Sequence, residues 1–159
     1  MSDLFAWWLS VELLGLVALP LAFVLFRNLA DRGYAFSKVL GLLLVSYGLW
    51  ITARLGMLPN SRGSVILLVT ALATVSLLVV GRVREEFRQF LAERAWLILQ
   101  VEALFLAAFL LWALVRSLNP AIAHTEQPMD FAFLNGILRS EHFPPLDPWL
   151  SGHSISYYY

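Results

Sequence analysis

The chain lacks cysteine and is poor in charged residues. Because none of its 159 residues is cysteine, the chain has no disulfide, no thiolate metal site and no thiol nucleophile. Charged residues make up 14% of the chain, against about 25% in a typical soluble protein. Hydrophobic residues make up 60%, and the formal net charge is zero, so nothing indicates nucleic-acid binding. A compact soluble fold of this size cannot bury so much apolar surface, and the sequence predicts an all-α integral membrane protein.

No basic residue precedes the first apolar segment. The first one in the chain is Arg27, which lies behind that segment. A cleavable signal peptide needs basic residues in front of its apolar part, so we expect the first segment to be retained as a membrane span.

Four long apolar segments are separated by short polar ones. Each is close to the roughly 20 residues with which a helix crosses about 30 Å of hydrocarbon. The segments are continuous rather than alternating in polarity, which favours helices over strands. The predicted spans are residues 4–26, 39–58, 64–80 and 96–115, and they form a bundle over residues 1–116.

The basic residues predict the orientation of the spans. The loops "RNLADRGYAFSK" and "GRVREEFRQFLAER" together hold seven Lys and Arg residues, whereas the segments on the other side hold three. Cytoplasmic loops carry the excess of positive charge. We therefore expect a multi-pass protein of the cell membrane, with both ends of the chain and the tail 117–159 on the outer side. The second basic loop has the pattern of a short helix.

Three charged residues fall inside the predicted spans. Glu12, Arg54 and Glu102 are costly in hydrocarbon and are candidates for function. Glu12 and Arg54 both fall in the outer half, and we expect them to pair. Glu102 falls in the inner half, where cytoplasmic-side arginines or a hydroxyl such as that of Thr74 are the expected partners. The alternatives are contacts between helices, a polar cavity and a lipid-phosphate contact.

Small residues recur every four positions in the second predicted span. Gly48, Thr52 and Gly56 would form a stripe along one side of a helix. Such a stripe lets a second helix approach closely. It predicts helix packing and no chemistry.

The tail has a different composition from the bundle. It holds four acidic residues, three histidines and five of the seven prolines. Residues 128–139 predict an amphipathic helix lying flat at the outer membrane surface, because the apolar residues from Phe131 to Leu138 gather on one face. Asp130 would project into that apolar face. The segment "FPPLDPW" then predicts a proline-rich extended tail with a turn at Asp147.

Glu126 and Asp130 lie one helical turn apart. Two carboxylates at this spacing can bind a divalent cation, or act as a general base and its supporting acid, and His124 is close enough in sequence to join as a metal ligand. Acidic residues in a first helical turn are also favoured by the helix dipole, which would explain both without a site. Both interpretations stay open on the residues alone.

The sequence resembles a known family over essentially its whole length. The stretch "NPAIAHTEQPMDFAFLNGILRSEHFPPLDPWLSGHSISYYY", preceded by "DRGYAFSK" and "GMLPNSRG", is similar to the bacterial and archaeal YYY membrane proteins. The family is named for its tyrosine triplet, here Tyr157, Tyr158 and Tyr159. Its usual glycine-rich approach to the triplet appears here as "SGHSIS".

The resemblance implies a longer polytopic protein, of which this chain is an N-terminal portion. Such proteins look like GT-C-type glycosyltransferases, which move a sugar from a polyprenyl-phosphate donor at the outer membrane face. Asp130 and Glu126 then match the acids of the first outer loop as catalytic residues, and with His124 as ligands of a divalent metal (Mg or Mn). The tyrosines would lie at headgroup level where the chain re-enters the membrane.

Two alternatives to a sugar transferase follow from the same sequence. One is a non-catalytic four-span accessory subunit of a larger membrane complex, which uses the small-residue stripe and the outer helix as contacts with other membrane subunits. The other is a lipid-handling or transport role for the charges inside the spans. Membrane lipids are partners in all three interpretations.

Overall fold

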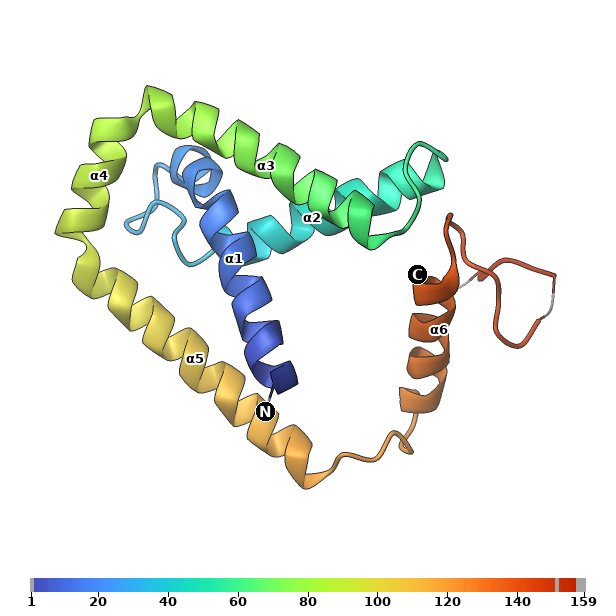
Figure 1. The fold of residues 1–159 in the computed structure, drawn as a ribbon. Helices are drawn as coiled ribbons and strands as arrows, with labels where there is room; N and C mark the ends of the chain where they lie inside the picture. The colour runs from blue at the N-terminus through green and yellow to red at the C-terminus, as the bar shows by residue number, and fades with distance from the viewer. Residues whose placement is uncertain (1, 151, 157–159) are drawn as a thin grey trace. The chain divides into compact units, whose positions relative to one another are not determined.

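The computed structural model describes residues 2–150 and 152–156. Within them the structure is helical, and the predicted all-α fold is confirmed. The helices, labelled in Figure 1, are α1 (Ser2–Leu25), α2 (Ser37–Arg54), α3 (Arg62–Arg82), α4 (Arg84–Glu93), α5 (Ala95–Leu118) and α6 (Gln127–Arg139). They form two compact units. Unit 1 comprises residues 1–45 and 69–118, and unit 2 comprises residues 46–68 and 119–159.

Three of the described helices are long and apolar enough to cross a membrane, namely α1, α3 and α5. Each has 21 to 24 residues, which corresponds to more than 30 Å at about 1.5 Å per residue. The second predicted span forms α2, which has 18 residues and stops at Arg54. Because its ends carry Lys38 and Arg54, α2 is less apolar than the other three. Length and composition thus support three spans among the described helices, and the crossing of the membrane by α2 stays a prediction.

The second basic loop forms α4 of unit 1, as its sequence predicts. Its charges point outward, while Phe87 and Phe90 pack against Phe23 of α1, with ring centroids 5.2 and 5.3 Å apart. The guanidinium of Arg32 lies 4.7 Å from the centre of the Phe23 ring and 3.3 Å from the carboxylate of Glu86. The apolar face of α4 thus covers the end of α1.

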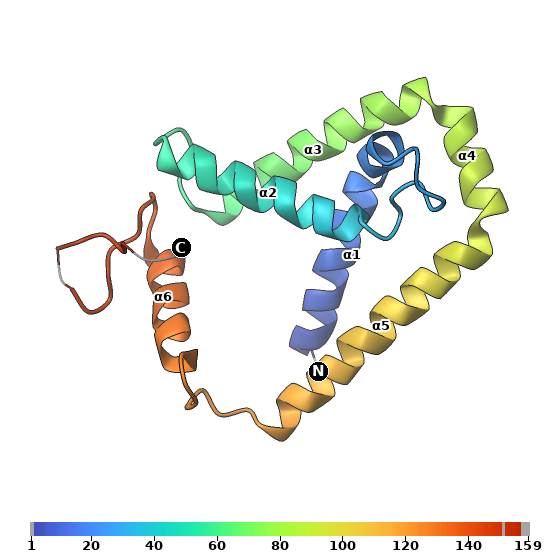
Figure 2. The same ribbon diagram turned by 180° about the vertical axis from the view of Figure 1, so that it is seen from behind.

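Loop 26–36 of unit 1 folds back beside the end of α1, so that α2 begins next to the middle of α1 (Figure 2). The fold-back depends on the turn at Asp31 to Gly33. Asp31 accepts hydrogen bonds from the backbone N–H groups of Gly33 at 3.1 Å and Ala35 at 3.0 Å. Gly33 has a φ of +77°, and a Cβ there would overlap the ring of Phe26. Only glycine fits this position.

Unit 2 is held together by Asn60 and by the folded tail. The Asn60 side chain donates to the carbonyl oxygens of Ile137 at 2.8 Å and Ser140 at 3.0 Å at the C-terminal end of α6, where the Ile137 carbonyl also accepts from the Ser140 backbone N–H. The tail turns back on itself, since Leu146 and Ser154 form an antiparallel bridge. Trp149 packs edge-on against the buried ring of Phe133. The tail is thus a small cover on α6 rather than the extended segment that the prolines predict.

The close approach of α1 and α2 gives a test of this packing. A Cβ added at Gly41 would overlap the backbone carbonyl of Leu14, which cannot move without shifting α1. We expect Gly41→Ala to lower stability by about 1–3 kcal/mol. The matched control is Gly81→Ala in α3, because a Cβ there meets nothing within 4 Å, and it should be neutral or slightly stabilising. Thermal unfolding of both variants in detergent measures the difference, and equal stability of the two would refute the predicted contact.

Candidate functional site

The best-defined polar cluster of unit 1 surrounds the only lysine of the chain. The ammonium group of Lys38 lies 3.1 Å from Oε2 of Glu12 in α1 and 2.5 Å from Oε1 of Glu102 in α5. The hydroxyl of Tyr34 donates to the same Glu102 oxygen at 2.7 Å. The side chain of Lys38 is 9% exposed. We call these four residues the Lys38 cluster.

Two glycines and the loop turn bring the Lys38 cluster together. Gly15 lies against the side chain and backbone of Lys38, where a Cβ would come within 2.7 Å of Cγ. Glu12 lies about one turn before Gly15 on α1, so its carboxylate is on the same side of that helix. The turn at Asp31 then places Tyr34 beside Glu102. Three helices and one loop therefore meet at a single ammonium group.

The electrostatics of the Lys38 cluster follow from its composition. Two carboxylates share one ammonium, and removing any of these charges from water is expensive unless it is paired and hydrogen-bonded. The ring of Phe105 lies 4.9 Å from the ammonium and adds a cation–π contact. Burial and the hydrogen bond to Glu102 raise the pKa of Tyr34 well above its ordinary value. Tyr34 therefore stays neutral and keeps donating to Glu102 over the whole physiological pH range.

This geometry corrects the partners expected from the sequence. Glu12 pairs with Lys38 rather than with Arg54, which is exposed at the end of α2 in unit 2. Glu102 pairs with Lys38 and Tyr34 rather than with arginines, and Thr74 donates instead to a carbonyl of its own helix. Sequence reasoning assigned Lys38 to a solvated loop. The available signal was its position at the very start of an apolar run, three residues before Gly41.

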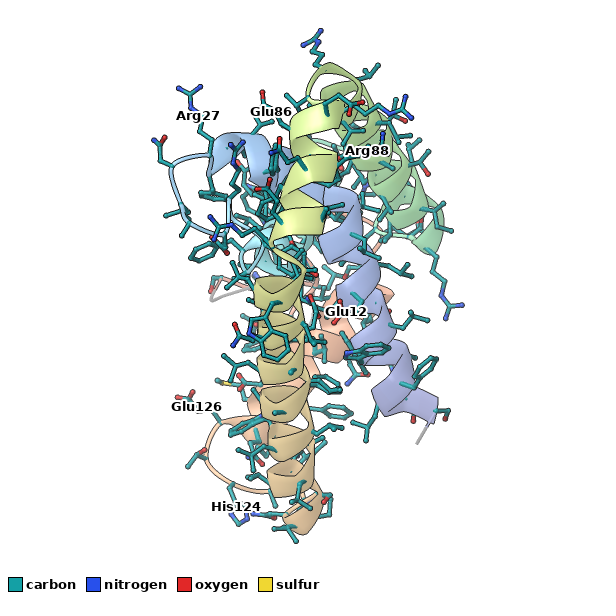
Figure 3. All side chains as sticks on the ribbon, turned by 90° about the vertical axis from the view of Figure 1, so that its left-hand side faces the viewer. Glu12, Arg27, Glu86, Arg88, His124 and Glu126 are labelled. Carbon is teal, nitrogen blue, oxygen red and sulfur yellow. The ribbon has the colours of Figure 1, made fainter. Side chains whose placement is uncertain are left out.

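One atom of the cluster has no partner. Oε1 of Glu12 is buried and forms no hydrogen bond with any residue that the structure describes. Figure 3 shows Glu12 part-way along α1, while Arg27, Glu86 and Arg88 lie at the end where the two basic loops meet. The Lys38 cluster is thus separate from the solvated charges of those loops.

The acidic residues predicted as a site lie in unit 2, at the start of α6. Glu126 immediately precedes the helix and Asp130 is in its first turn, with the Asp130 backbone N–H donating to the Glu126 carbonyl at 2.9 Å. Both residues are exposed, as is His124. Figure 3 shows the side chains of His124 and Glu126 directed outward from the loop. Among residues 2–150 and 152–156, no three His, Asp or Glu side chains are grouped so as to hold a metal ion.

The apolar face of α6 divides into two parts. Phe133 is buried under the tail, whereas Phe131, Leu134 and Leu138 are 51%, 51% and 70% exposed. These three residues form one stripe along α6, and Asp130 lies one turn before Leu134 at the edge of that stripe. Asp130 therefore borders the exposed apolar stripe instead of projecting into its centre.

The small-residue stripe is shorter than expected. Gly48 faces Leu68 of α3 within unit 2, and the Thr52 hydroxyl donates to the Gly48 carbonyl at 2.7 Å. Gly56 lies beyond the end of α2 with a φ of +69° and ends the helix, as glycines with positive φ commonly do. The predicted interfacial tyrosines Tyr157, Tyr158 and Tyr159 lie outside the described residues.

Comparison with known proteins identifies a family. Residues 44–159, more than two thirds of the chain, match the family described as "Uncharacterized membrane protein (DUF2298)". The chain belongs to this family. No curated protein and no solved structure matches. DUF2298 membership confirms the resemblance at the level of a membrane protein family, and the likeness to GT-C glycosyltransferases stays a prediction. The match begins inside α2, so Glu12, Tyr34 and Lys38 lie before the part shared with DUF2298.

The Lys38 cluster predicts a strong effect of one substitution. Lys38→Met keeps the length of the side chain and leaves two carboxylates without their cation, which costs about 3–5 kcal/mol for a buried pair. We expect a large fall in the thermal unfolding midpoint in detergent, while Arg27→Met in the neighbouring loop changes it little. Replacing both carboxylates as well, by Glu12→Gln and Glu102→Gln, should restore much of the stability. A Lys38→Met protein as stable as the wild type would show that the charges are not coupled.

Proposed function

We propose that this membrane protein takes part in the transfer of a sugar from a polyprenyl-phosphate carrier at the outer membrane face. The observation that supports the proposal is the combination, on α6, of two exposed carboxylates with an exposed apolar stripe. Glu126 and Asp130 are one turn apart at the start of the helix, and the stripe of Phe131, Leu134 and Leu138 begins beside them. An amphipathic helix of this kind lies in the membrane interface. Its acids would then be at the depth of lipid headgroups, where the phosphate of the carrier is found.

The roles of the two acids follow from the chemistry of the transfer. The acceptor hydroxyl must lose a proton as its oxygen attacks the anomeric carbon, and the carrier phosphate leaves with the bonding electrons. Asp130 is proposed as the base, supported by Glu126. Alternatively, both carboxylates would hold Mg²⁺ or Mn²⁺ by oxygen, with His124 of the preceding loop as a further ligand, and the ion would neutralise charge on the carrier phosphate as it leaves.

This role requires α6 to be on the outer side, and a parity argument supports four spans. The end of α1 and the loop that follows it both contact α4 in unit 1, through Phe23 with Phe90 and Arg32 with Glu86. The chain between this loop and α4 therefore starts and finishes at the same membrane surface. Because α3 is long and apolar enough to cross, we propose that α2 crosses as well. Even without the buried Lys38, the inner loops hold six arginines against three in the outer segments.

The topology can be tested with single cysteines, since the chain has none of its own. Asn28 and Ser61 are both exposed and lie on either side of α2. In intact cells we expect an impermeant thiol reagent to label Ser61→Cys but not Asn28→Cys until the membrane is permeabilised. His142→Cys in the tail should behave like Ser61→Cys. Equal labelling of Asn28→Cys and Ser61→Cys would show that α2 does not cross the membrane.

The role of Asp130 can be tested by Asp130→Asn, which keeps the shape of the side chain and removes its charge. We expect release of radiolabelled sugar from a panel of polyprenyl-phosphate sugars to fall by at least 100-fold, the usual lower range for losing a general base, with unchanged expression and membrane insertion. Glu141→Gln is the matched control, because Glu141 is an exposed acid just beyond α6. An Asp130→Asn protein with full transfer activity would assign Asp130 to helix-dipole stabilisation alone.

A second candidate function is supported by a different observation. In the structure α5 has no buried residue along its 24 residues. Apart from the side of Glu102 and Phe105, which contacts Lys38, the surface of α5 is available to lipid or to other membrane helices, as in a non-catalytic accessory subunit that packs against the other members of a complex.

A further inference from the structure

A pocket of about 420 Å³ lies in unit 2 between α6 and the folded tail. Its α6 side is one helical face, with residues spaced three and four positions apart, and its other side is the tail at its turn. The volume falls within the range of small-molecule sites, which is roughly 300–1,000 Å³. The lining residues used below are Ala132, Asn135 and Arg139 of α6 and Leu146, Asp147 and Pro148 of the tail.

The polar groups of this pocket are held in place by the backbone and keep bonding capacity. Oδ1 of Asp147 accepts from the backbone N–H groups of Trp149 at 2.8 Å and Leu150 at 3.0 Å, which fixes the carboxylate in the turn. Its second oxygen, Oδ2, forms no hydrogen bond with the described residues. The Nδ2 group of Asn135 donates to the Phe131 carbonyl at 2.7 Å, and its Oδ1 remains as an acceptor. Arg139 adds an exposed guanidinium.

These groups match one class of ligand. A carboxylate and an amide oxygen accept hydrogen bonds from hydroxyl groups, and the guanidinium binds an oxyanion through two parallel hydrogen bonds. Leu146, Pro148 and Ala132 offer an apolar wall for the C–H face of a ring. A simple anion would use the arginine alone and would be repelled by Asp147. A ring with several hydroxyls and one acidic group uses every feature of the lining.

We propose that this pocket binds a saccharide that carries an acidic group. The oxyanion contacts Arg139, the hydroxyls donate to Asp147 and Asn135, and the ring lies against Pro148 and Leu146. The oxyanion can be the carboxylate of a sugar acid or the phosphate of a sugar phosphate, since a guanidinium recognises both in the same way.

The pocket lies on the opposite side of α6 from the proposed reacting acid. Arg139 follows Asp130 by nine residues, which at about 100° per residue places it roughly 180° around the helix. The saccharide bound there does not take part in the transfer itself. The inference rests on the proposed function for its context, and it assigns the pocket to anchoring a glycan beside the membrane surface.

Binding is measured with the whole chain in lipid nanodiscs by isothermal titration calorimetry. The probes are glucuronate, glucose 1-phosphate, glucose and inorganic phosphate. We expect at least one of the two acidic sugars to bind about tenfold or more tightly than both glucose and inorganic phosphate, the effect of about one charge-assisted hydrogen bond. Preference for glucuronate indicates a sugar acid, and preference for glucose 1-phosphate a sugar phosphate. Absence of binding, or inorganic phosphate bound as tightly as the sugars, would overturn the inference.

Two variants locate the binding to this pocket. Asp147→Asn keeps a side-chain oxygen for the turn and removes the free carboxylate oxygen, and Arg139→Gln removes the guanidinium. Each should weaken binding of the acidic sugar about tenfold, whereas the controls Glu141→Gln and Arg62→Gln should not change it. Unchanged binding in Arg139→Gln places the sugar elsewhere, even if Asp147→Asn fails to fold.

The outcome is separable from that of the proposed function. Transfer that depends on Asp130 without saccharide binding would refute the pocket assignment alone. Saccharide binding that needs Arg139, in a protein whose transfer is unaffected by Asp130→Asn, would refute the role of Asp130 alone.

Discussion

The shared ammonium of Lys38 is the contact on which unit 1 depends. Apolar side chains give helices little preference for one another in lipid, because lipid tails cover them equally well. A charge in the same environment must be paired, and this requirement is specific. Glu12 and Glu102 lie on helices that are far apart in sequence, and both reach the first turn of α2. The position and register of α1, α2 and α5 are therefore set by one side chain, with Gly15 and Gly41 providing the room.

Unit 2 is held together by hydrogen bonds to the backbone and by packing of the tail on α6. It combines parts of α2 and α3 with a short helix and a folded tail, and the carbonyl groups at the end of α6 can accept further donors. Asn60, from the turn between α2 and α3, provides two hydrogen bonds to them. Phe133 then gives the tail an apolar surface to close on. As a result, an exposed apolar stripe remains beside Asp130, and a different face of α6 lines a pocket that has both polar and apolar walls.

The helices were predictable from the sequence, and their polar partners were not. Continuous apolar runs and the amphipathic pattern around Phe131 predict where helices form, because helical periodicity and burial are local properties. The pairing of Glu12 with Lys38 depends on how far loop 26–36 folds back, and the turn at Gly33 decides this. The position of a residue along a straight membrane helix does not reveal such a fold-back. Glu126 and Asp130 were predictable as acids at the start of α6, whereas the exposed position of Asp130 at the edge of the apolar stripe was not. The position of Asp147 in the wall of the pocket was not predictable from the sequence, because it depends on the folding of the tail onto α6.

These contacts also change how the charges inside the membrane are interpreted. Ionisable residues in spans are candidates for function by default, yet Lys38 and Glu102 form bonds that a structural role fully explains. Glu12 differs, since one of its oxygens is buried without a partner among the described residues, as are Trp8 Nε1 and Ser76 Oγ. In α6 and the tail, backbone hydrogen bonds orient Asp147 and Asn135 and leave one oxygen of each available. Groups that are fixed in place but incompletely bonded are suited to recognising a ligand, because little ordering is needed on binding. On this criterion the groups of unit 2 meet the requirement for a binding surface better than the paired charges of Lys38 and Glu102 in unit 1.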